Sequence, residues 1–443
     1  MNKEILVVES AGPLSGTMEL AGAKNATLVM MIALLLVRGK SQLHNVPNIA
    51  DVHSMIHLLE SLGAKVRYDI QNHILSVDAT AIEYTSVDAH IMKQTRASIL
   101  VLGALLARTG KASVSFPGGD AIGARPIDFH IKGLKKLGII IEQEQDTIHA
   151  VVDTLQGSRI ILEYPSVGAT ENIILAATAA PGITTIINAA IEPEVLDLIQ
   201  LLCCMGADIT VCAPATIHIQ GGRLLIPVTY TVMVDRLEAG TLLIATALTG
   251  GTLYLPTANP NNLDVVLFKL EEMGHSIMLD SQEHGIRLIA TSQPNSVSLK
   301  TGPYPNFPTD LQAPILVAQC CATGISTIEE TVFENRLSHV KELLRMGAQI
   351  TATQNKATIT GLPYLEGTWV VANDIRASSA LVLAGLIARG VTYIDGVSHW
   401  RRGYEALEQK LAHLGASIII QKMADSAETI VMQTSSMVEQ PLV

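Results

Sequence analysis

Residues 195–212 read Val-Leu-Asp-Leu-Ile-Gln-Leu-Leu-Cys-Cys-Met-Gly-Ala-Asp-Ile-Thr-Val-Cys, and this stretch decides the fold. Its apolar residues recur at helical spacing up to Met205, a glycine ends the helix, and the alternation that follows predicts a strand. The phrase Leu/Met-Gly that closes the helix occurs six times, at Gly63, Gly138, Gly206, Gly274, Gly347 and Gly415. The spacings of 75, 68, 68, 73 and 68 residues indicate six copies of one unit.

Each unit also contains an earlier helix that is apolar almost all round. These helices are predicted from Asn25 onward and over residues 97–107, 172–180, 239–248, 311–321 and 377–388. Each starts after a polar phrase, ends at a glycine and is followed by a β-rich stretch such as TTIINA. A uniformly apolar helix should be buried, whereas the amphipathic helix that ends at Leu/Met-Gly should lie outside. The predicted unit is therefore β-α-β-α-β.

Six such units are expected to pack as two groups of three, each group around its own shared core. The predicted domains are residues 22–234, with a mobile loop at about 115–126, and residues 1–21 together with 235–420. Residues 4–20 should then pack with the C-terminal half, and residues 421–443 should form a tail. The starts of the buried helices would converge on a cleft, and helix N-termini bind anions.

Composition limits the classes of function. Of the 443 residues, 48% are hydrophobic, 16% are charged and 4% are aromatic, which fits an α/β protein with a large core. A net charge of −11 argues against a general nucleic-acid binder. The longest uncharged stretch, residues 172–191, is interrupted by Pro181-Gly182, so no membrane span is expected.

Cysteine and histidine patterns limit the chemistry further. The five cysteines contain no CxxC pair, which fits a reducing cytosol better than disulfides or zinc. The thirteen histidines show no HExxH or other metal spacing, so no metal is expected.

Several polar phrases before the buried helices contain candidate functional residues. Lys24-Asn25 can reach an anion at a helix start, or Asn25 can be an ordinary cap beside a solvated lysine. Arg96 and Arg376 occupy equivalent places in the second and sixth units. They can be clamps on opposite sides of a cleft, or Arg376 can pair with Asp374.

Three further segments permit both a functional and a structural interpretation. The loop from Pro117 to Pro126 is rich in glycine and contains Asp120 and Arg125, so it is either a lid or a long surface connection. Asp310 directly precedes a buried helix and can be a cap or a base. Arg401-Arg402 can be a solvated basic doublet.

Taken in order, the phrases of this chain resemble the UDP-N-acetylglucosamine enolpyruvyl transferase family from about residue 6 to about residue 420. The phrases are GAKNAT, NVPNIADV, RASIL, FPGGDAIGARPIDFHI, SVGATENI, EPEVLDL, FPTDLQA, ETVFENR, DIRASSALVLAG and RRGYE. The related shikimate-pathway enzymes typically have Gly-Ser-Lys-Ser near the start, whereas this chain has Gly-Ala-Lys-Asn at 22–25.

The resemblance implies a two-domain inverted α/β barrel of six β-α-β-α-β repeats, three per domain, with the active site in the interdomain cleft. It implies transfer of the enolpyruvyl group of phosphoenolpyruvate to the 3-hydroxyl of UDP-N-acetylglucosamine with release of phosphate. That reaction is the first committed step of peptidoglycan synthesis, and through it serves cell wall biogenesis, cell shape and cell division. The family acts in the cytoplasm on these two small molecules and needs no cofactor, metal, nucleic acid or membrane.

The resemblance also implies roles for individual residues. The implied catalytic residues are Asp120, Asp310, Lys24 and Arg402, and the implied phosphoenolpyruvate ligands are Lys24, Asn25, Arg125, Arg376 and Arg402. The implied UDP-N-acetylglucosamine ligands are Arg96, Arg125, Pro126, Ile127, Asp128, Phe129, Ser166, Val167, Asp310, Val332 and Arg336. Asp374 matches a second carboxylate near the reacting centre.

One position departs from the usual family pattern. The lid loop normally carries a cysteine where this chain has Asp120, and some family members do carry aspartate there. A proton donor at neutral pH needs a raised pKa, so closure of the lid over substrate is expected to raise the pKa of Asp120. A carboxylate is a weaker nucleophile than a thiolate, which predicts resistance to the epoxide fosfomycin. Two alternatives stay open: a catalytically silent UDP-sugar-binding relative, and an enolpyruvyl transferase with a different hydroxyl acceptor.

Overall fold

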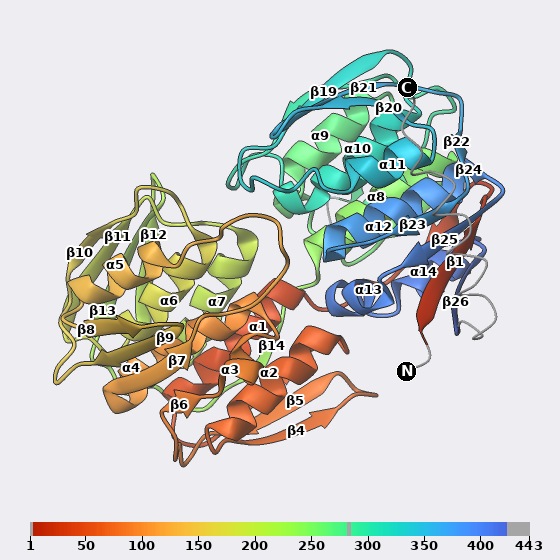
Figure 1. The fold of residues 1–443 in the computed structure, drawn as a ribbon. Helices are drawn as coiled ribbons and strands as arrows, with labels where there is room; N and C mark the ends of the chain where they lie inside the picture. Colours follow the sequence, from red (N-terminus) through yellow and green to blue (C-terminus); the bar gives the residue numbers. More distant parts are fainter. Residues whose placement is uncertain (1–2, 281–284, 423–443) are drawn as a thin grey trace.

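The computed structural model describes residues 3–280 and 285–422, which form two lobes (Figure 1). Each lobe has its own hydrophobic core. One core runs from Ala23 to Val232, and the other combines residues between Leu6 and Leu20 with residues between Leu237 and Ile418. These separate cores support domain boundaries near residues 22 and 235, which we propose as the division of the chain.

The six predicted units are present, and each builds one four-stranded sheet. In the first lobe, the first sheet has the order β14 (Thr229–Thr231), β3 (Lys40–His44), β5 (Ile74–Asp78), β4 (Lys65–Asp69). The second sheet has the order β6 (Ser86–Val87), β7 (Lys111–Ser115), β9 (Thr147–Val151), β8 (Ile140–Glu144). The third sheet has the order β10 (Arg159–Ile161), β11 (Gly182–Ile187), β13 (Thr216–Gly221), β12 (Asp208–Cys212).

The second lobe repeats this arrangement. Its first sheet has the order β2 (Ser15–Thr17), β15 (Thr252–Leu255), β17 (Gly285–Ile289), β16 (Ser276–Asp280). Its second sheet has the order β18 (Leu299–Lys300), β19 (Ile325–Glu329), β21 (Lys356–Thr360), β20 (Gln349–Ala352). Its third sheet has the order β23 (Trp369–Val371), β25 (Val391–Asp395), β1 (Glu4–Glu9), β26 (Ile418–Lys422). A small sheet joins β22 (Leu365–Glu366) to β24 (Ala388–Arg389).

Every unit contains one strand more than the predicted β-α-β-α-β order. The segment after each of the first five Leu/Met-Gly phrases is an antiparallel pair of strands, as in β4 with β5 and β12 with β13, whereas β26 after the sixth phrase pairs with the N-terminal strand β1. The first two strands of each sheet are parallel, as in β6 with β7. A parallel pair needs a crossover, and in the sheets that begin with β6, β10, β18 and β23 the buried helix between the first two strands supplies it.

The helices fill the interior of both lobes and the sheets lie outside them (Figure 1), so the architecture is inverted as expected. The first helices of the units are α1 (Lys24–Ala33), α4 (Val101–Thr109), α6 (Val167–Ala177), α8 (Arg236–Thr249), α10 (Gln312–Cys320) and α12 (Ile375–Ile387). Eight of the ten residues of α1 are buried, whereas strand β4 buries none. Within the described ranges no sheet closes into a hydrogen-bonded barrel.

The second helices each expose part of their surface. They are α2 (Ala50–Ser61), α5 (Asp128–Lys136), α7 (Pro193–Cys204), α9 (Asp264–Glu272), α11 (Val340–Arg345) and α14 (Leu407–His413), with short extra helices α3 (Ala89–Met92) and α13 (Val397–Gly403). Helix α6 begins five residues before the predicted start because Ser166 caps it, accepting a hydrogen bond from the backbone of Ala169. Helix α7 is more buried than predicted and packs on α1.

Glycine at the end of each second helix has a physical cause. The six glycines of the Leu/Met-Gly phrases all have positive φ, from 86° to 111°. A residue with a side chain is strained in this left-handed region, whereas glycine is not. The repeat that is visible in the sequence is therefore a repeat of helix ends.

The two lobes exchange strands. Strand β1 lies between β25 and β26, and β2 pairs with β15, which confirms that these N-terminal strands pack with the C-terminal half. Strand β14, near the end of the first lobe, completes the first sheet. The two crossing segments bridge at Gly22 and Val234. Strand β26 continues to residue 422, so the tail predicted from residue 421 was placed two residues too early; residues 423–443 lie outside the described residues.

Candidate functional site

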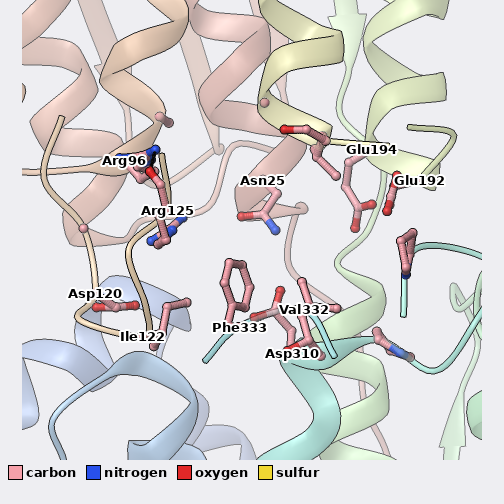
Figure 2. A pocket seen from close by; sticks show the side chains of 18 of the residues that line it. Asn25, Arg96, Asp120, Ile122, Arg125, Glu192, Glu194, Asp310, Val332 and Phe333 are labelled. Carbon is pink, nitrogen blue, oxygen red and sulfur yellow. Dashed lines mark hydrogen bonds between the residues drawn. The ribbon is translucent and has the colours of Figure 1, made fainter. Parts of the chain in front are cut away.

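A cleft of about 530 Å3 is lined by residues from both lobes (Figure 2). Most of the predicted site residues line it: Lys24, Asn25, Arg96, Asp120, Arg125, Pro126, Phe129, Ser166, Val167, Asp310, Val332, Arg336, Arg376 and Arg402. Ile127 and Asp128 do not. Ile127 packs against the first core, and Asp128 opens α5 with its carboxylate 3.6 Å from Lys132 Nζ. Both residues precede the cleft residue Phe129 in the sequence, but their side chains do not line the cleft.

Every unit contributes the start of its first helix to this cleft. The lining includes Lys24 of α1, Arg96 of the short 3-10 helix before α4, Val167 of α6, Arg236 of α8, Asp310 of the 3-10 turn before α10 and Arg376 of α12. The predicted convergence of helix N-termini on one cleft is confirmed. Partial positive charge from these helix ends and the side-chain cations make the site suited to anionic ligands.

One buried carboxylate joins cations from the two lobes. Asp51, in the first turn of α2, is 2% exposed, and its Oδ2 lies 2.9 Å from Lys24 Nζ. Its Oδ1 accepts a hydrogen bond of 2.8 Å from Arg402 Nε, which comes from α13 in the other lobe. The sequence interpretation missed Asp51, although it lies in the quoted phrase NVPNIADV. A carboxylate in the first turn of a helix is so common that its position alone carries no functional signal.

The lid loop joins this cluster. Asp120 Oδ1 lies 2.6 Å from Arg402 NH1, so Arg402 is held by Asp51 on one side and by the lid on the other. The lid also contacts the second lobe where Ile122 O accepts a hydrogen bond of 3.0 Å from Asn335 N. The loop from Pro117 to Pro126 is thus seated against both lobes.

The pKa of Asp120 shifts in the direction opposite to that expected of a proton donor. Burial acts to raise this pKa, but His399, Arg402 and Lys24 outweigh burial and hold the pKa well below its ordinary value. His399 Nδ1 lies 3.8 Å from Asp120 Oδ1 and was not foreseen as a neighbour. Asp120 is therefore an ionised carboxylate in this arrangement. The expected rise in its pKa depended on substrate charge, which is not part of this structure.

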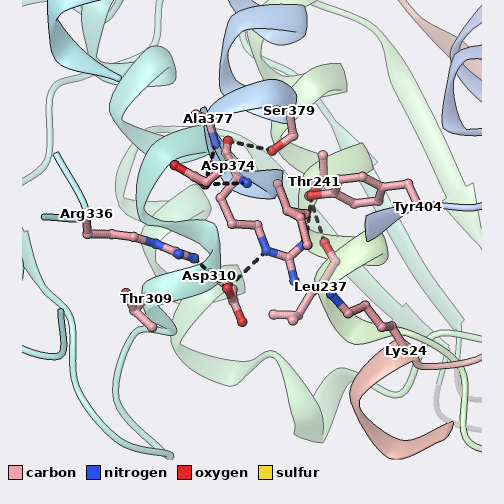
Figure 3. A network of polar contacts seen from close by, with 12 residues as sticks. Lys24, Leu237, Thr241, Thr309, Asp310, Arg336, Asp374, Ala377, Ser379 and Tyr404 are labelled. Atoms are coloured by element: carbon pink, nitrogen blue, oxygen red, sulfur yellow. Dashed lines mark hydrogen bonds and ion pairs between the residues drawn. The ribbon is translucent and has the colours of Figure 1, made fainter. Parts of the chain in front are cut away.

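Asp310 is the centre of a second ion-pair cluster (Figure 3). Its Oδ1 lies 2.5 Å from Arg336 NH2 and 3.0 Å from Arg376 Nε. Arg376 also donates a 2.9 Å hydrogen bond to the hydroxyl of Tyr404. Burial acts to raise the pKa of Asp310, but the two arginines outweigh it and the pKa lies well below its ordinary value. Asp310 is not the cap of its helix, because no side-chain capping bond is formed there.

Asp374 has a structural role and does not line the cleft, which corrects its expected place near the reacting centre. It is 3% exposed, and its Oδ1 accepts hydrogen bonds of 2.8 and 3.0 Å from the backbone of Arg376 and Ala377. This is an N-cap of α12. The guanidinium of Arg376 is thereby left to pair with Asp310.

Aromatic and aliphatic side chains separate the charged clusters. Phe333 lies between two cations, with its ring centroid 5.5 Å from the guanidinium carbon of Arg125 and 5.7 Å from that of Arg336. Glu330 is 2% exposed and accepts hydrogen bonds from the backbone of Val332 and Phe333. This pair of bonds holds Val332, a predicted site residue, at the cleft surface (Figure 2).

The opposite end of the cleft is acidic, and sequence reasoning did not identify it. Glu192 and Glu194 lie there (Figure 2), and Glu194 forms a two-bond pair with Arg236 at 2.9 and 3.1 Å. Glu171 is also in the lining and is 4% exposed. Burial, with negative Glu194 and Glu192 nearby, raises the pKa of Glu171 well above its ordinary value. The quoted phrase EPEVLDL contained two of these residues, but only the fold brings Glu171 to them.

Residues 3–280 and 285–422 contain no candidate metal-ligand group and no candidate membrane-spanning helix. No three His, Cys, Asp or Glu side chains there form a group that could hold a metal ion. All five cysteines are free thiols. No helix of that part of the chain is both long and apolar enough to cross a membrane.

The sequence is similar to known proteins along nearly its whole length. A family model described as EPSP synthase (3-phosphoshikimate 1-carboxyvinyltransferase) matches residues 8–411. The UDP-N-acetylglucosamine 1-carboxyvinyltransferase of Desulfosudis oleivorans is 46% identical over 413 residues, which cover 93% of this chain and 98% of that protein. The protein of the same name from Shewanella amazonensis is 44% identical, with 94% and 99% covered.

Solved structures share the fold. The enolpyruvyl transferase NikO from Streptomyces tendae superposes with a TM-score of 0.85 at 23% identity, over 96% of this chain and all of that one. An EPSP synthase from Acinetobacter baumannii superposes with a TM-score of 0.74 at 16% identity, over 95% of this chain and all of that one. At these identities the likeness establishes the architecture alone.

Proposed function

The chain belongs to the UDP-N-acetylglucosamine 1-carboxyvinyltransferase family, and from this premise we propose that it transfers the enolpyruvyl group of phosphoenolpyruvate to the 3-hydroxyl of UDP-N-acetylglucosamine and releases phosphate. The supporting relatives are 43–46% identical to this chain over 93–94% of its length. The arrangement of charges in the cleft supports the same reaction.

The observation that carries the proposal is the pairing of Lys24 and Arg402 through Asp51. These two cations come from different lobes and lie within hydrogen-bonding distance of one buried carboxylate. Phosphoenolpyruvate carries a phosphate and a carboxylate close together, so it can bind both cations at once. Asn25, Arg125 and Arg376, which also line the cleft, complete the proposed binding set.

Asp120 is the proposed proton donor to C3 of phosphoenolpyruvate. Its pKa is low because Arg402, Lys24 and His399 surround it. Substrate anions that bind Lys24 and Arg402 neutralise this positive charge and add negative charge beside Asp120. Both changes raise its pKa, which is the condition for a carboxyl group to act as a general acid.

Asp310 is the proposed acceptor for the proton of the attacking hydroxyl. The hydroxyl oxygen forms a bond to C2 while C3 gains a proton from Asp120, which gives a tetrahedral adduct. C3 then loses a proton, the C2–C3 double bond returns, and the C2–O bond to phosphate breaks. Two arginines hold Asp310 in place and weaken it as a base, so its position next to the hydroxyl matters more than its basicity.

The proposed UDP-N-acetylglucosamine ligands line the same cleft. They are Arg96, Arg125, Pro126, Phe129, Ser166, Val167, Asp310, Val332 and Arg336. The predicted contribution of Ile127 and Asp128 would have to come from their backbone. The nucleotide sugar then extends from the Phe129 and Ser166 side of the cleft toward Asp310.

The reaction would be the first committed step of peptidoglycan synthesis and would serve cell wall biogenesis, cell shape and cell division. We place it in the cytoplasm because five free thiols fit a reducing compartment.

Phosphate release measured with phosphoenolpyruvate and a series of acceptors tests the proposed function. Release with UDP-N-acetylglucosamine, and a product heavier than that acceptor by one enolpyruvyl group, is the expected result. Release only with another acceptor, such as shikimate 3-phosphate, would replace the proposed acceptor. Tight binding of UDP-N-acetylglucosamine without release from any acceptor would identify a catalytically silent sugar-nucleotide binder.

Asp120 also leads us to propose resistance to fosfomycin. The lid of this chain presents a carboxylate where an epoxide would need a strong nucleophile. Incubation with fosfomycin should leave activity intact, whereas Asp120→Cys should keep substantial activity and lose it with time in the presence of fosfomycin. Rapid inactivation of the unchanged protein, with the label on residues 115–126, would contradict this.

A further inference from the structure

Tyr404 lies outside the cleft but is bonded to a residue inside it. Its side chain is 4% exposed, belongs to the second core and directly follows α13. The Tyr404 hydroxyl accepts a 2.9 Å hydrogen bond from Arg376 NH1, and the ring centroid lies 5.4 Å from the Arg376 guanidinium carbon. Arg376 lines the cleft, whereas Tyr404 is not among the described residues that do. The contact is a route by which a residue outside the cleft can act on a ligand.

The hydroxyl proton of Tyr404 has a fixed direction (Figure 3). Thr241 Oγ1 lies 2.8 Å from Leu237 O and 3.2 Å from the Tyr404 hydroxyl oxygen. A carbonyl oxygen only accepts hydrogen bonds, so the single hydroxyl proton of Thr241 is directed at Leu237. Thr241 therefore accepts the proton of Tyr404, and a guanidinium can only donate. The result is one chain of donors, from Arg376 to Tyr404, then to Thr241 and to the backbone of Leu237.

The chain is buried and joins three helices. Thr241 on α8 is 0% exposed, and Arg376 in the first turn of α12 is 5% exposed. Tyr404 reaches both from the end of α13. That helix packs closely on α12, because a Cβ atom on Gly403 would lie 2.2 Å from Ile375 Cγ2. Dense packing leaves the phenol ring little freedom, so its hydroxyl is a fixed acceptor.

Two of the three guanidinium nitrogens of Arg376 are held by this arrangement. Nε donates a 3.0 Å hydrogen bond to Asp310 Oδ1, and NH1 donates to Tyr404. A guanidinium is planar, so two fixed bonds also fix the direction of the third nitrogen, NH2. Without the Tyr404 hydroxyl, NH1 loses its anchor and the guanidinium can turn about its bond to Asp310. Arg336, which also binds Asp310, keeps that carboxylate in place.

We propose that Tyr404 is a positioning residue that, with Thr241 behind it, orients the guanidinium of Arg376 toward phosphoenolpyruvate. The proposal deepens the proposed function and rests on it for the identity of this substrate. Once Nε and NH1 are held, a charged N–H group of fixed direction suits a phosphate or carboxylate oxygen. Tyr404 acts on the substrate through Arg376 and is therefore not a catalytic residue.

Steady-state phosphate release, with each substrate varied in turn, tests the proposal. Tyr404→Phe keeps the ring beside Arg376 but removes the hydroxyl. The KM for phosphoenolpyruvate should rise about 10-fold, as expected for a weakened hydrogen bond to a charged group. The KM for UDP-N-acetylglucosamine should stay within about twofold, because Arg336 still holds Asp310. A variant that is only destabilised would contain less active enzyme and would lower kcat without changing either KM.

Thr241 provides a second variant, one step further from the cleft. Thr241→Val has nearly the same shape but removes the acceptor of the Tyr404 proton, so the KM for phosphoenolpyruvate should rise about 3- to 10-fold. Thr241→Ser keeps the hydroxyl and should restore the KM of the unchanged protein. Tyr393→Phe is the control for loss of a phenol hydroxyl, because Tyr393 is 39% exposed on β25. Both KM values should be unchanged in this control.

The outcomes separate this inference from the proposed function. An unchanged KM for phosphoenolpyruvate in a folded Tyr404→Phe variant overturns the inference and leaves the enzyme assignment intact. Equal rises in KM for both substrates also overturn it. If Tyr404→Phe does not fold, an unchanged KM for phosphoenolpyruvate in Thr241→Val overturns it. No phosphate release by the unchanged protein with these two substrates overturns the proposed function and removes the substrate that the inference names.

Discussion

The cleft contains two clusters in which carboxylates are held by cations, one around Asp51 and one around Asp310. Asp51 binds Lys24 from its own lobe and Arg402 from the other, and Arg402 also binds the lid through Asp120. Asp310 binds two arginines, both from its own lobe. The first cluster spans both lobes and a loop, whereas the second is confined to one lobe.

This difference shows how one cleft can combine a cluster whose geometry can rearrange, around Asp51, with a cluster whose geometry is fixed, around Asp310. The side chains of Arg336 and Arg376 are 2% and 6% exposed, whereas that of Arg402 is 19% exposed. A buried pair of arginines held by a well-packed lobe keeps its geometry, because protein interiors are densely packed. The cluster around Asp51 depends on the position of both lobes and the lid, so substrate binding can rearrange it.

The largest expected effect is at Asp120. Asp120→Asn cannot donate a proton to carbon, so kcat should fall by about 10²- to 10⁴-fold. Asp120→Cys provides a proton donor of higher ordinary pKa, so the alkaline limb of its pH–rate profile should move to higher pH than in the unchanged enzyme. Stopped-flow phosphate release measures both. Near-normal kcat in Asp120→Asn would exclude Asp120 as the acid.

The second effect is at Arg402. Arg402→Ala removes a cation shared by the lid and Asp51, and kcat/KM should fall by about 10²- to 10³-fold. Arg401→Ala is the matched control, because Arg401 is exposed and pairs with Glu4 at the surface. The control should keep its activity, and both variants should melt close to the unchanged protein. Equal activities of the two variants would remove Arg402 from the site.

A smaller effect is expected at Asp51. Asp51→Asn leaves Lys24 and Arg402 without their shared anion, so kcat/KM for phosphoenolpyruvate should fall by about 10- to 100-fold. The KM for UDP-N-acetylglucosamine should change little, because the Asp310 cluster is independent of Asp51. Asp69→Asn, at an exposed carboxylate that accepts hydrogen bonds from the neighbouring Asn72, is the control. A double-mutant cycle with Arg402→Ala should be strongly non-additive, and additivity would contradict the coupling.

The smallest effect concerns stability in acid. The pKa of Asp310 is lowered in the folded protein, so its ion pairs add stability above the unfolded pKa of about 3.9. That contribution is lost as the pH falls from there through the lower folded pKa. Urea unfolding from pH 7 to pH 3 should show a weaker pH dependence in Asp310→Asn than in the unchanged protein. An unchanged slope would show that the cluster does not stabilise the fold.

Much of the fold was predictable because its signals are local. The Leu/Met-Gly phrases mark helix ends, where the chain needs a left-handed residue, and a short phrase shows that requirement. The fourth strand was not predicted, because turns such as residues 145–146 and 353–355 are short and polar and leave no break in the pattern. The start of α6 was placed too late because Ser166-Val167-Gly168 resembles a loop and only the cap reveals the helix.

The site was predictable where a residue type was unusual for its surroundings. Cations and carboxylates beside apolar helices, such as Lys24, Arg376 and Asp310, were found in this way. Asp374 was misplaced, because a carboxylate two residues before an arginine can serve the helix backbone or the cleft. Asp51 and Glu171 were missed, since each lies in a segment that is ordinary by composition.

The sequence by itself determined the repeat, the order of the two helices in each unit, and the set of charged residues at the helix starts. Only the tertiary structure decided which charges meet: Arg402 with Asp51 and Asp120, and Arg376 with Asp310. The physical reason is that helix ends depend on bonds between residues a few positions apart. Ion pairs and pKa values depend on distances between residues that are far apart in the chain, 66 positions for Arg376 and Asp310 and 351 for Arg402 and Asp51, and those distances exist only after the chain has packed.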